Sequence, residues 1–213
     1  PHIHTLQLAQ IGCLDDACVQ RLAALPRLVH LDVSQPGVSQ LGVPPASLTD
    51  AGVIPLLQRH TLLTSLHVGK NAALSSAAVD AMGPHLTHLV ADGLVNVSAD
   101  AWIRLWQRCP HLAHLSLRGA GITDACVAAL AQLPHLTTLT LHSNALTKAG
   151  LSALARVPLH TLDVGFVRSV DDELLDTLAA SIPTLTKLYV FGCPRVTHFA
   201  HPRITVIGRE RRA

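Results

Sequence analysis

The stretch LTTLTLHSNALT at residues 136–147 contains the pattern from which the fold of this chain can be predicted. In its first half, apolar and polar residues alternate with a period of two, as in a short strand with one buried face, and helical spacing follows. An apolar residue followed by others three and five positions later recurs along the whole chain. These units begin at Ile3, Leu28, Leu63, Leu86, Leu112, Leu136, Leu159 and Leu185.

The intervals between unit starts predict the domain organisation. Six of the seven intervals span 23 to 26 residues, and one spans 35. A fixed period in this range predicts a solenoid in which each unit packs on its neighbours. The long interval is rich in Pro and Gly, which predicts a loop insertion over residues 36–47 in the second repeat. We predict a single domain over residues 1–213, with a cap and tail over 199–213 in which Phe199 closes the stack. Because Pro1 lies inside the pattern, we also expect a C-terminal fragment of a longer protein.

Helix starts recur at matching places in the units. The segments LTDAGV at 48–53 and ITDACV at 122–127 each offer a Thr to cap the first backbone N–H groups of a helix and an acidic residue for its first turn. Proline then precedes several units, because proline cannot continue a helix. Cys18 and Cys126 occupy the same place in two of these helices, so we expect both to be buried.

With these units, the chain resembles a leucine-rich repeat protein over nearly all of its length. The segment LTKLYVFGCPRVT at 185–197 resembles the cysteine-containing repeats of F-box proteins, and residues 136–147 resemble the ribonuclease-inhibitor type. The resemblance implies an α/β fold, a horseshoe-shaped leucine-rich repeat solenoid of about eight strand–helix repeats, with a parallel concave sheet and convex helices. It also implies that Asn71, Asn144 and Cys193, at the ninth position of their units, bond the backbone of the turn.

Composition argues against several other kinds of protein. The formal net charge is only +2, which does not predict a surface that follows a phosphate backbone, so we expect no direct nucleic-acid binding. No apolar stretch is long enough to span a membrane, so we expect no membrane contact. The five cysteines show no short paired spacing, so we expect a reducing, intracellular location, either cytoplasmic or nuclear.

The fourteen histidines suggest a metal or catalytic role, but their places in the repeat argue against one. His88 and His114 fall on neighbouring strands, close enough to share a metal. The next residues at that position are Ser65 and Thr138, so a third ligand is missing. Motifs of serine hydrolases, phosphate-binding loops and zinc proteases are absent from the sequence. We therefore predict no enzyme activity, no catalytic residue, no metal and no cofactor.

The tyrosine and phenylalanine residues all lie in the last two units. By the repeat register, Phe166, Tyr189 and Phe191 project onto the concave side or its rim. Aromatic rings beside charged residues have the composition of a protein-binding hot spot. The candidate partner-binding residues are Arg118, His142, Asp163, Phe166, Lys187, Tyr189 and Phe191. The alternative is that the rings seal the open end of the stack. Trp102 and Trp106 are expected to pack in the convex layer.

The family resemblance implies a non-catalytic protein–protein interaction domain that holds a protein partner on its concave face. In F-box proteins, such repeats present a substrate to a cullin-type ubiquitin ligase, and a preceding helical segment docks the Skp adaptor; here that segment would precede Pro1. Residues 188–197 and 204–209 are similar to the end of the fungal leucine-rich repeat proteins of nucleotide-excision repair, which implies a role in DNA-damage recognition and ubiquitylation. Two alternatives are a structural scaffold subunit of a large axonemal or organellar assembly, and a ribonuclease-inhibitor-like protein, for which a strongly acidic groove would be expected.

Overall fold

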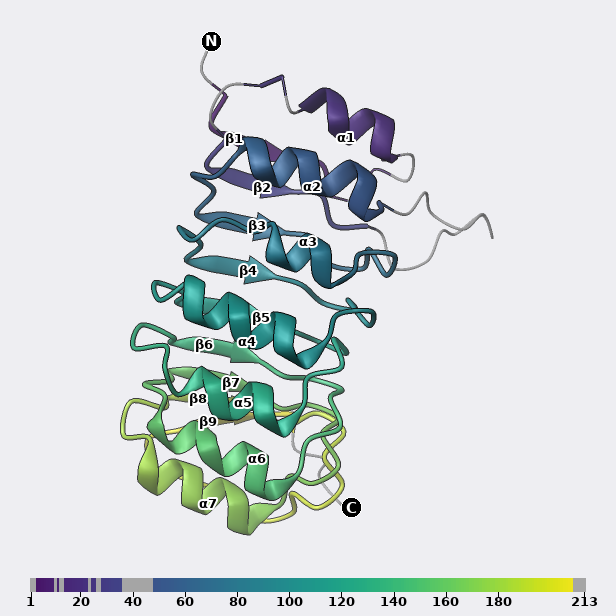
Figure 1. Cartoon of the computed structure of the whole chain (residues 1–213). Coiled ribbons are helices and arrows are strands. Elements are labelled where there is room, and N and C mark those ends of the chain that lie inside the picture. Colours follow the sequence, from purple (N-terminus) through teal and green to yellow (C-terminus); the bar gives the residue numbers. More distant parts are fainter. Residues whose placement is uncertain are drawn as a thin grey trace.

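The computed structural model describes residues 3–9, 11, 14–22, 24–25, 28–35 and 48–208. Within this part of the chain, nine short strands form one parallel sheet in sequence order (Figure 1). They are β1 (Thr5–Gln7), β2 (His30–Asp32), β3 (Ser65–His67), β4 (His88–Val90), β5 (His114–Ser116), β6 (Thr138–Thr140), β7 (Thr161–Asp163), β8 (Lys187–Tyr189) and β9 (Thr205–Ile207). The predicted loop insertion over 36–47 and residues 209–213 of the predicted tail lie outside the described residues.

Each strand of the sheet presents its central residue to the core. Leu139, at the centre of β6, is fully buried and pairs in register with Leu115 and Leu162 on the neighbouring strands. The residues before and after it are more exposed, as the alternating pattern predicts. The central positions along the sheet are Leu6, Leu31, Leu66, Leu89, Leu115, Leu139, Leu162, Leu188 and Val206.

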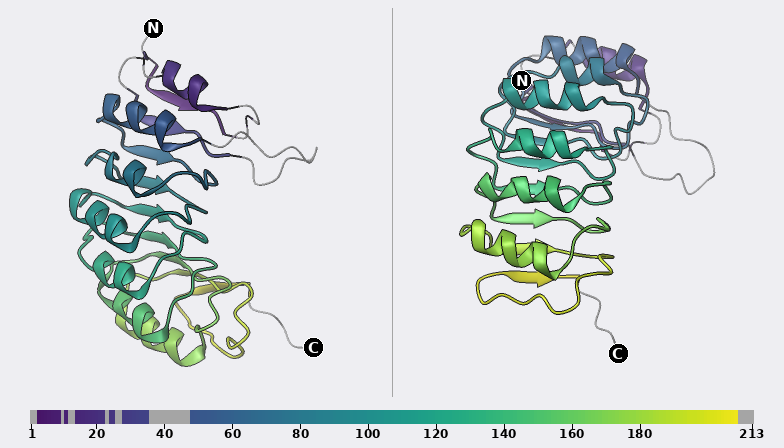
Figure 2. Two further views of the ribbon diagram at one scale, coloured as in Figure 1. Left: turned by 45° about the vertical axis from the view of Figure 1, so that its right-hand side comes forward. Right: turned by 60° about the horizontal axis from the view of Figure 1, so that its bottom comes forward.

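The helices lie along the convex side of the curved stack (Figure 2). They are α1 (Asp16–Leu22), α2 (Asp50–Arg59), α3 (Ser76–Asp80), α4 (Ala99–Arg108), α5 (Asp124–Leu130), α6 (Lys148–Ser152) and α7 (Asp172–Ser181), with a 3₁₀ helix, η1 (Ala153–Arg156). Their apolar faces and the strand centres form one continuous core, because no single repeat can bury its own apolar face. The predicted leucine-rich repeat fold is confirmed.

The C-terminal end has one strand more than the eight predicted repeats. The sequence predicts a cap over this region, but β9 pairs in parallel with β8 and places Val206 beside Leu188. No helix follows β9 within the described residues. Phe199 is buried in the loop before β9, and its backbone N–H donates to Asp172 Oδ1 (2.9 Å) at the start of α7. The final loop therefore packs on the last helix, and the sheet ends on a short strand.

Hydrogen bonds between successive helix starts join the repeats. Thr147 precedes α6; its hydroxyl donates to Asp124 Oδ2 (2.5 Å) and accepts from the Gly150 N–H (3.1 Å). Its own N–H donates to Asp124 Oδ1 (3.0 Å). The acidic residue in the first turn of one helix therefore also supports the start of the next. The same arrangement joins Asp16 to Thr49 and Asp50 to Ser75. Asp172 accepts from Thr197 in the same way, although no helix begins at Thr197.

This arrangement explains the glycine in two of the helix starts. Gly150 is the third residue of α6, and a Cβ atom at that position would overlap the Asp124 carboxylate of the preceding repeat. A Cβ atom on Gly52, the third residue of α2, would overlap Asp16 in the same way. At these two positions the aspartate of the preceding repeat lies so close that only glycine leaves it room. In α3 the third residue is Ala78, although Asp50 also reaches forward to Ser75, so the requirement does not hold in every repeat.

Cys126 and Cys18 occupy this third helical position in α5 and α1, with different outcomes. The helix before α5 begins with Ala99 instead of aspartate, which leaves room for the Cys126 thiol; it is buried, 3.7 Å from the Ala99 carbonyl oxygen. Cys18 is exposed, so the prediction that both are buried is wrong for Cys18. The reason is that α1 is the first helix of the described chain, and no described helix precedes it.

Candidate protein-binding surface

The candidate residues come from four consecutive repeats in the C-terminal half of the sheet. Asp163, Lys187 and Tyr189 lie within strands, and the others lie in the segments that leave them. By element, Arg118 follows β5, His142 follows β6, Asp163 ends β7, Phe166 follows β7, Lys187 and Tyr189 belong to β8, and Phe191 follows β8.

Arg118 is held between two carboxylates on either side of its strand. Its Nη2 lies 3.2 Å from Asp163 Oδ2, two strands away, and its Nε lies 3.9 Å from Asp92 Oδ2 on the preceding repeat. Its backbone N–H donates to Asp92 Oδ1 (2.9 Å). Asp163 is only 7% exposed and also accepts from the Gly165 N–H (2.9 Å). The guanidinium is therefore ordered before any partner arrives, while half of the Arg118 side chain faces solvent.

Asp92 is a member of this group that sequence reasoning did not select. It precedes Arg118 at the same position of the neighbouring repeat, and it also accepts from the Ser116 hydroxyl (2.7 Å). The signal was present in the sequence as an Asp and an Arg at equivalent positions of successive units. The contact from Arg118 to Asp163, by contrast, crosses β6 and depends on the length of the arginine side chain.

The aromatic side chains are arranged along the edge where strands end. The rings of His142 and Phe166 lie 5.0 Å apart and are tilted, and His142 Nδ1 lies 2.8 Å from the Ser143 hydroxyl. Phe166 is 56% exposed and Phe191 is 47% exposed. A Cβ atom on Gly192 would lie 2.6 Å from the Phe166 ring, so this glycine makes space for the ring.

Lys187 and Tyr189 belong to the next strand of the same face. Lys187 is exposed, and Tyr189 is half-buried beside Asp163 and Ile207 in the register. Within the described residues, neither side chain makes a hydrogen bond or ion pair with the Arg118 group. The structure thus brings together Arg118 with Asp163, and His142 with Phe166, but not Lys187 with either pair.

The eighth residue of each of six repeats has a left-handed backbone where the chain leaves the strand. In three repeats this residue is glycine: Gly93, Gly119 and Gly192. Lys70, Ser143 and Phe166 adopt the same conformation with φ of 64, 61 and 57°. This conformation costs a residue with a side chain roughly 1–2 kcal/mol. Phe166 therefore combines backbone strain with an exposed ring.

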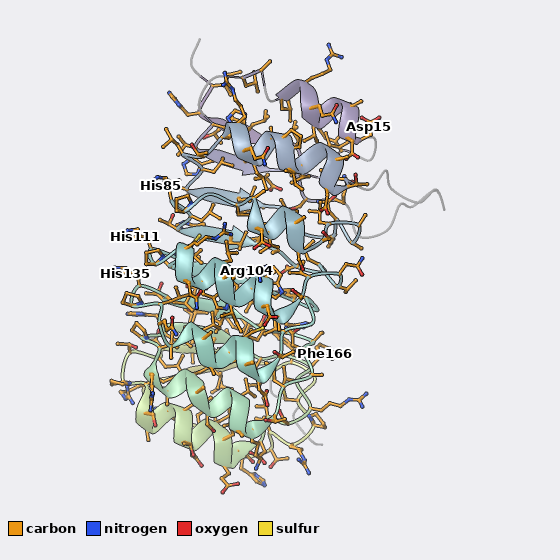
Figure 3. All side chains as sticks on the ribbon, in the orientation of Figure 1. Asp15, His85, Arg104, His111, His135 and Phe166 are labelled. Carbon is orange, nitrogen blue, oxygen red and sulfur yellow. The ribbon has the colours of Figure 1, made fainter. Side chains whose placement is uncertain are left out.

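A pocket of about 600 Å³ lies beside Phe166, between the segments that follow β6 and β7. Figure 3 places Phe166 at the edge of the solenoid opposite to His85, His111 and His135. The pocket is lined by Ser143, Asn144, Ala145, Leu146, Phe166, Arg168 and Ser169. Sequence reasoning missed Arg168, because the tenth residue of the unit has no common character: it is Gly121, Ala145 and Pro194 in neighbouring repeats.

Histidines on the concave face of the N-terminal half contact either another histidine or a carboxylate. The His88 and His114 rings stack with centroids 4.2 Å apart, and His67 Nδ1 lies 3.3 Å from Asp32 Oδ2. Burial lowers the pKa of His88, and the nearby His114, His30 and His67 lower it further. Among the described residues, no group of three or more His, Cys, Asp or Glu side chains could hold a metal ion.

Burial disfavours the thiolate form of two cysteines, Cys109 and Cys193. Burial raises the pKa of Cys109 to about 11 and also raises the pKa of Cys193. The Cys193 thiol donates to the Val164 carbonyl oxygen (3.3 Å), so it bonds the turn as the repeat resemblance implies. Protonated thiols of this kind are poor nucleophiles and poor metal ligands.

His60 provides a pH-dependent contribution to stability. It is buried; the Leu28 N–H donates to its Nδ1 (3.4 Å), and its Nε2 lies 3.3 Å from the Leu22 carbonyl oxygen. Burial and the charge of Arg59 lower its pKa, although the Leu22 carbonyl opposes them. Because the pKa of His60 is lower in the folded than in the unfolded chain, the unfolded chain takes up the proton first as the pH falls. The contribution of neutral His60 to the free energy of unfolding is therefore fully present above pH 6.5 and is lost as the pH falls below this value.

We expect His60→Gln to flatten this pH dependence, because glutamine keeps a donor and an acceptor but does not titrate. Urea unfolding of the two proteins across the pH range below 6.5 would measure it. The exposed His135→Gln serves as the control and should leave the slope unchanged. An equal slope in wild type and His60→Gln would contradict this assignment.

Comparison with known proteins relates these repeats to DNA repair proteins. A sequence profile described as Leucine Rich repeat matches residues 108–131 and 132–155. The DNA repair protein rhp7 of Schizosaccharomyces pombe is 30% identical over 228 residues, which cover 99% of this chain and 38% of rhp7. The chain is a leucine-rich repeat protein related to the fungal DNA repair proteins Rad7 and rhp7. The DNA repair protein RAD7 of Saccharomyces cerevisiae is 47% identical over 51 residues, 23% of this chain and 9% of RAD7.

Solved structures share the fold of this Rad7-related chain. A chain in the crystal structure of the Rad7 and Elc1 complex in yeast has a TM-score of 0.70 and 22% identity, over 98% of this chain and 68% of that one. Internalin C2 from Listeria monocytogenes has a TM-score of 0.60 and 21% identity, over 92% of this chain and 74% of its own. No helix in the described part of the chain is long and apolar enough to cross a membrane.

Proposed function

We propose that the chain is a non-catalytic recognition domain of a DNA repair factor, and that it binds a protein partner with the C-terminal half of its concave face and rim. The relation to rhp7 and RAD7 supports the repair role. The observation that carries the binding role is an ordered guanidinium, Arg118 held by Asp92 and Asp163, within the same four repeats that expose the rings of Phe166 and Phe191. Ordered arginine and aromatic side chains lose little conformational entropy on binding, so they favour a protein interface.

We extend this proposal to the assembly in which the domain acts. The yeast crystal structure contains Rad7 in a complex with Elc1, which supports a role for proteins of this kind as members of larger complexes. The resemblance to F-box repeats supports a substrate-recognition subunit of a cullin-type ubiquitin ligase, with the adaptor bound outside the 213 residues of this chain. The relation to DNA repair proteins also supports a nuclear location.

The double variant Tyr189→Ala/Phe191→Ala tests the surface. It is expected to abolish partner capture, because Tyr189 and Phe191 are the aromatic rings that β8 and the residues after it present to solvent. Affinity purification of the full-length protein from nuclear extract, with quantitative comparison of co-purified proteins, measures the effect. Circular dichroism and thermal unfolding check that the fold is unchanged. His30→Ala, exposed on β2 of the same sheet, is the matched control and should retain capture. Full retention of partners by the double variant would assign the rings to capping instead.

A further inference from the structure

The pocket beside Phe166 has a mostly apolar wall with one available charge. Asn144 cannot serve a ligand, since its Nδ2 donates to the Leu117 and Leu141 carbonyl oxygens (2.8 and 2.9 Å) and its Oδ1 accepts from the Ile122 N–H (3.1 Å). The hydroxyls at its edge are also engaged: Ser143 pairs with His142, and Ser169 donates to the Leu146 carbonyl oxygen (2.6 Å).

Arg168 differs from the other polar residues of the lining. It is exposed, and among the described residues its guanidinium has no hydrogen-bond or carboxylate partner. The acidic residues that follow Arg168 in the sequence are engaged elsewhere: Asp171 and Glu173 are paired with Lys148, and Asp172 accepts hydrogen bonds from Thr197, His198 and Phe199. The pocket therefore carries an unneutralised positive charge at its edge, which favours a ligand with a negative charge next to an apolar group.

The backbone at Phe166 gives independent support for a binding role. Glycine fills the equivalent left-handed position in three other repeats, so the strain and the exposed ring are not required by the turn. Strained residues that expose an apolar ring over a pocket are typical of binding sites.

We propose that this pocket binds a bulky apolar side chain of a partner polypeptide that carries an Asp or Glu next to it, with Phe166 against the apolar group and Arg168 against the carboxylate. The inference rests on the proposed function in protein recognition and names the chemistry of the partner. A peptide fits better than a nucleic acid, because a phosphate backbone is held by several cations and the lining provides only Arg168.

Selection from a phage-displayed library of random peptides on the immobilised wild-type chain tests the proposal. Enrichment of sequences with Leu, Ile, Met, Phe or Trp next to Asp or Glu is expected. A synthetic enriched peptide with a fluorescent label then gives the affinity by anisotropy. Phe166→Gly should weaken binding at least about tenfold while leaving the thermal unfolding midpoint unchanged or raised, since glycine relieves the left-handed strain. Arg168→Glu should weaken it similarly, and a peptide with Lys in place of its acidic residue should restore binding to that variant.

The matched control is Lys70→Gly, which makes the same backbone change at the same repeat position outside the pocket. It should bind the peptide as wild type does. Absence of enrichment, enriched peptides without an acidic residue, or equal peptide binding by Phe166→Gly would each overturn the proposal. Anisotropy with a labelled single-stranded oligo-dT, if binding is strong in wild type and lost in Phe166→Gly, would overturn it in favour of a nucleic-acid site. If no acidic–apolar peptide binds the pocket but Tyr189→Ala/Phe191→Ala still loses its protein partner, the proposed function stands and only the inference about the pocket is overturned.

Discussion

Replacement of Trp106 with Ala is expected to lower the free energy of unfolding by about 3–5 kcal/mol, because a large buried ring is removed and the cavity can close only in part. Trp106 and Trp102 are both fully buried, and their rings stack with centroids 5.5 Å apart in α4. This confirms the predicted packing in the convex layer. Since α4 packs on both α3 and α5, the loss also weakens the interfaces on which neighbouring repeats depend.

Urea unfolding followed by circular dichroism measures this loss. Trp106→Phe is the control: Trp106 Nε1 has no hydrogen-bond partner in the described part of the chain, so phenylalanine removes volume but no hydrogen bond, and we expect a cost of about 1 kcal/mol. A change of less than about 1 kcal/mol for Trp106→Ala would mean that the core near α4 collapses around the gap. Broadening of the transition would indicate that the repeats on either side unfold separately.

Asn144→Leu is expected to cost about 3 kcal/mol, although leucine is the more apolar residue, because buried backbone groups lose their partners. The Asn144 side chain satisfies two carbonyl oxygens, of Leu117 and Leu141, and the N–H of Ile122. The equivalent ninth position of another repeat is occupied by Leu94, which is fully buried. Because a leucine side chain fits this position, the loss of unfolding free energy in Asn144→Leu measures the lost hydrogen bonds.

Equilibrium unfolding in urea measures the effect of Asn144→Leu, with Asn96→Leu as its control. Asn96 is exposed and also donates to a backbone carbonyl, that of Ala72 (2.7 Å), but water can replace this bond, so we expect a change within about 0.5 kcal/mol. Equal costs at the two positions would show that burial of the amide at Asn144 contributes nothing beyond a surface hydrogen bond.

The outcome for the ninth position shows how far a resemblance extends. Asn71 and Asn144 each donate to carbonyl oxygens of their own and the preceding repeat, and Cys193 donates to Val164. These bonds were implied by the repeat type and are confirmed. The other five repeats have no such side chain, and the sheet continues through them because the central residue of each strand is buried in every repeat from Leu31 to Leu188.

The period of apolar residues predicted eight of the nine strands and the residue that each buries, and the resemblance to leucine-rich repeats implied their parallel order; β9 was not predicted. This prediction is possible because each repeat must bury an apolar residue at the centre of its strand, whichever residues the neighbouring repeats have. Side-chain direction on a strand follows from the same alternation, so the neighbouring places of His88 and His114 were also predictable.

Contacts between units depended on the tertiary structure. The forward reach of Asp124 to Thr147, the ion pair from Arg118 across β6 to Asp163 and the pocket between Asn144 and Phe166 each depend on how closely two repeats approach. The exposure of Cys18 and the burial of Cys126 also depend on the neighbouring repeat, because the two residues occupy the same position in their helices. Periodicity within a unit specifies which residues face inward, but the distance to the next unit is set by the side chains of both, and this is decided only when the repeats pack.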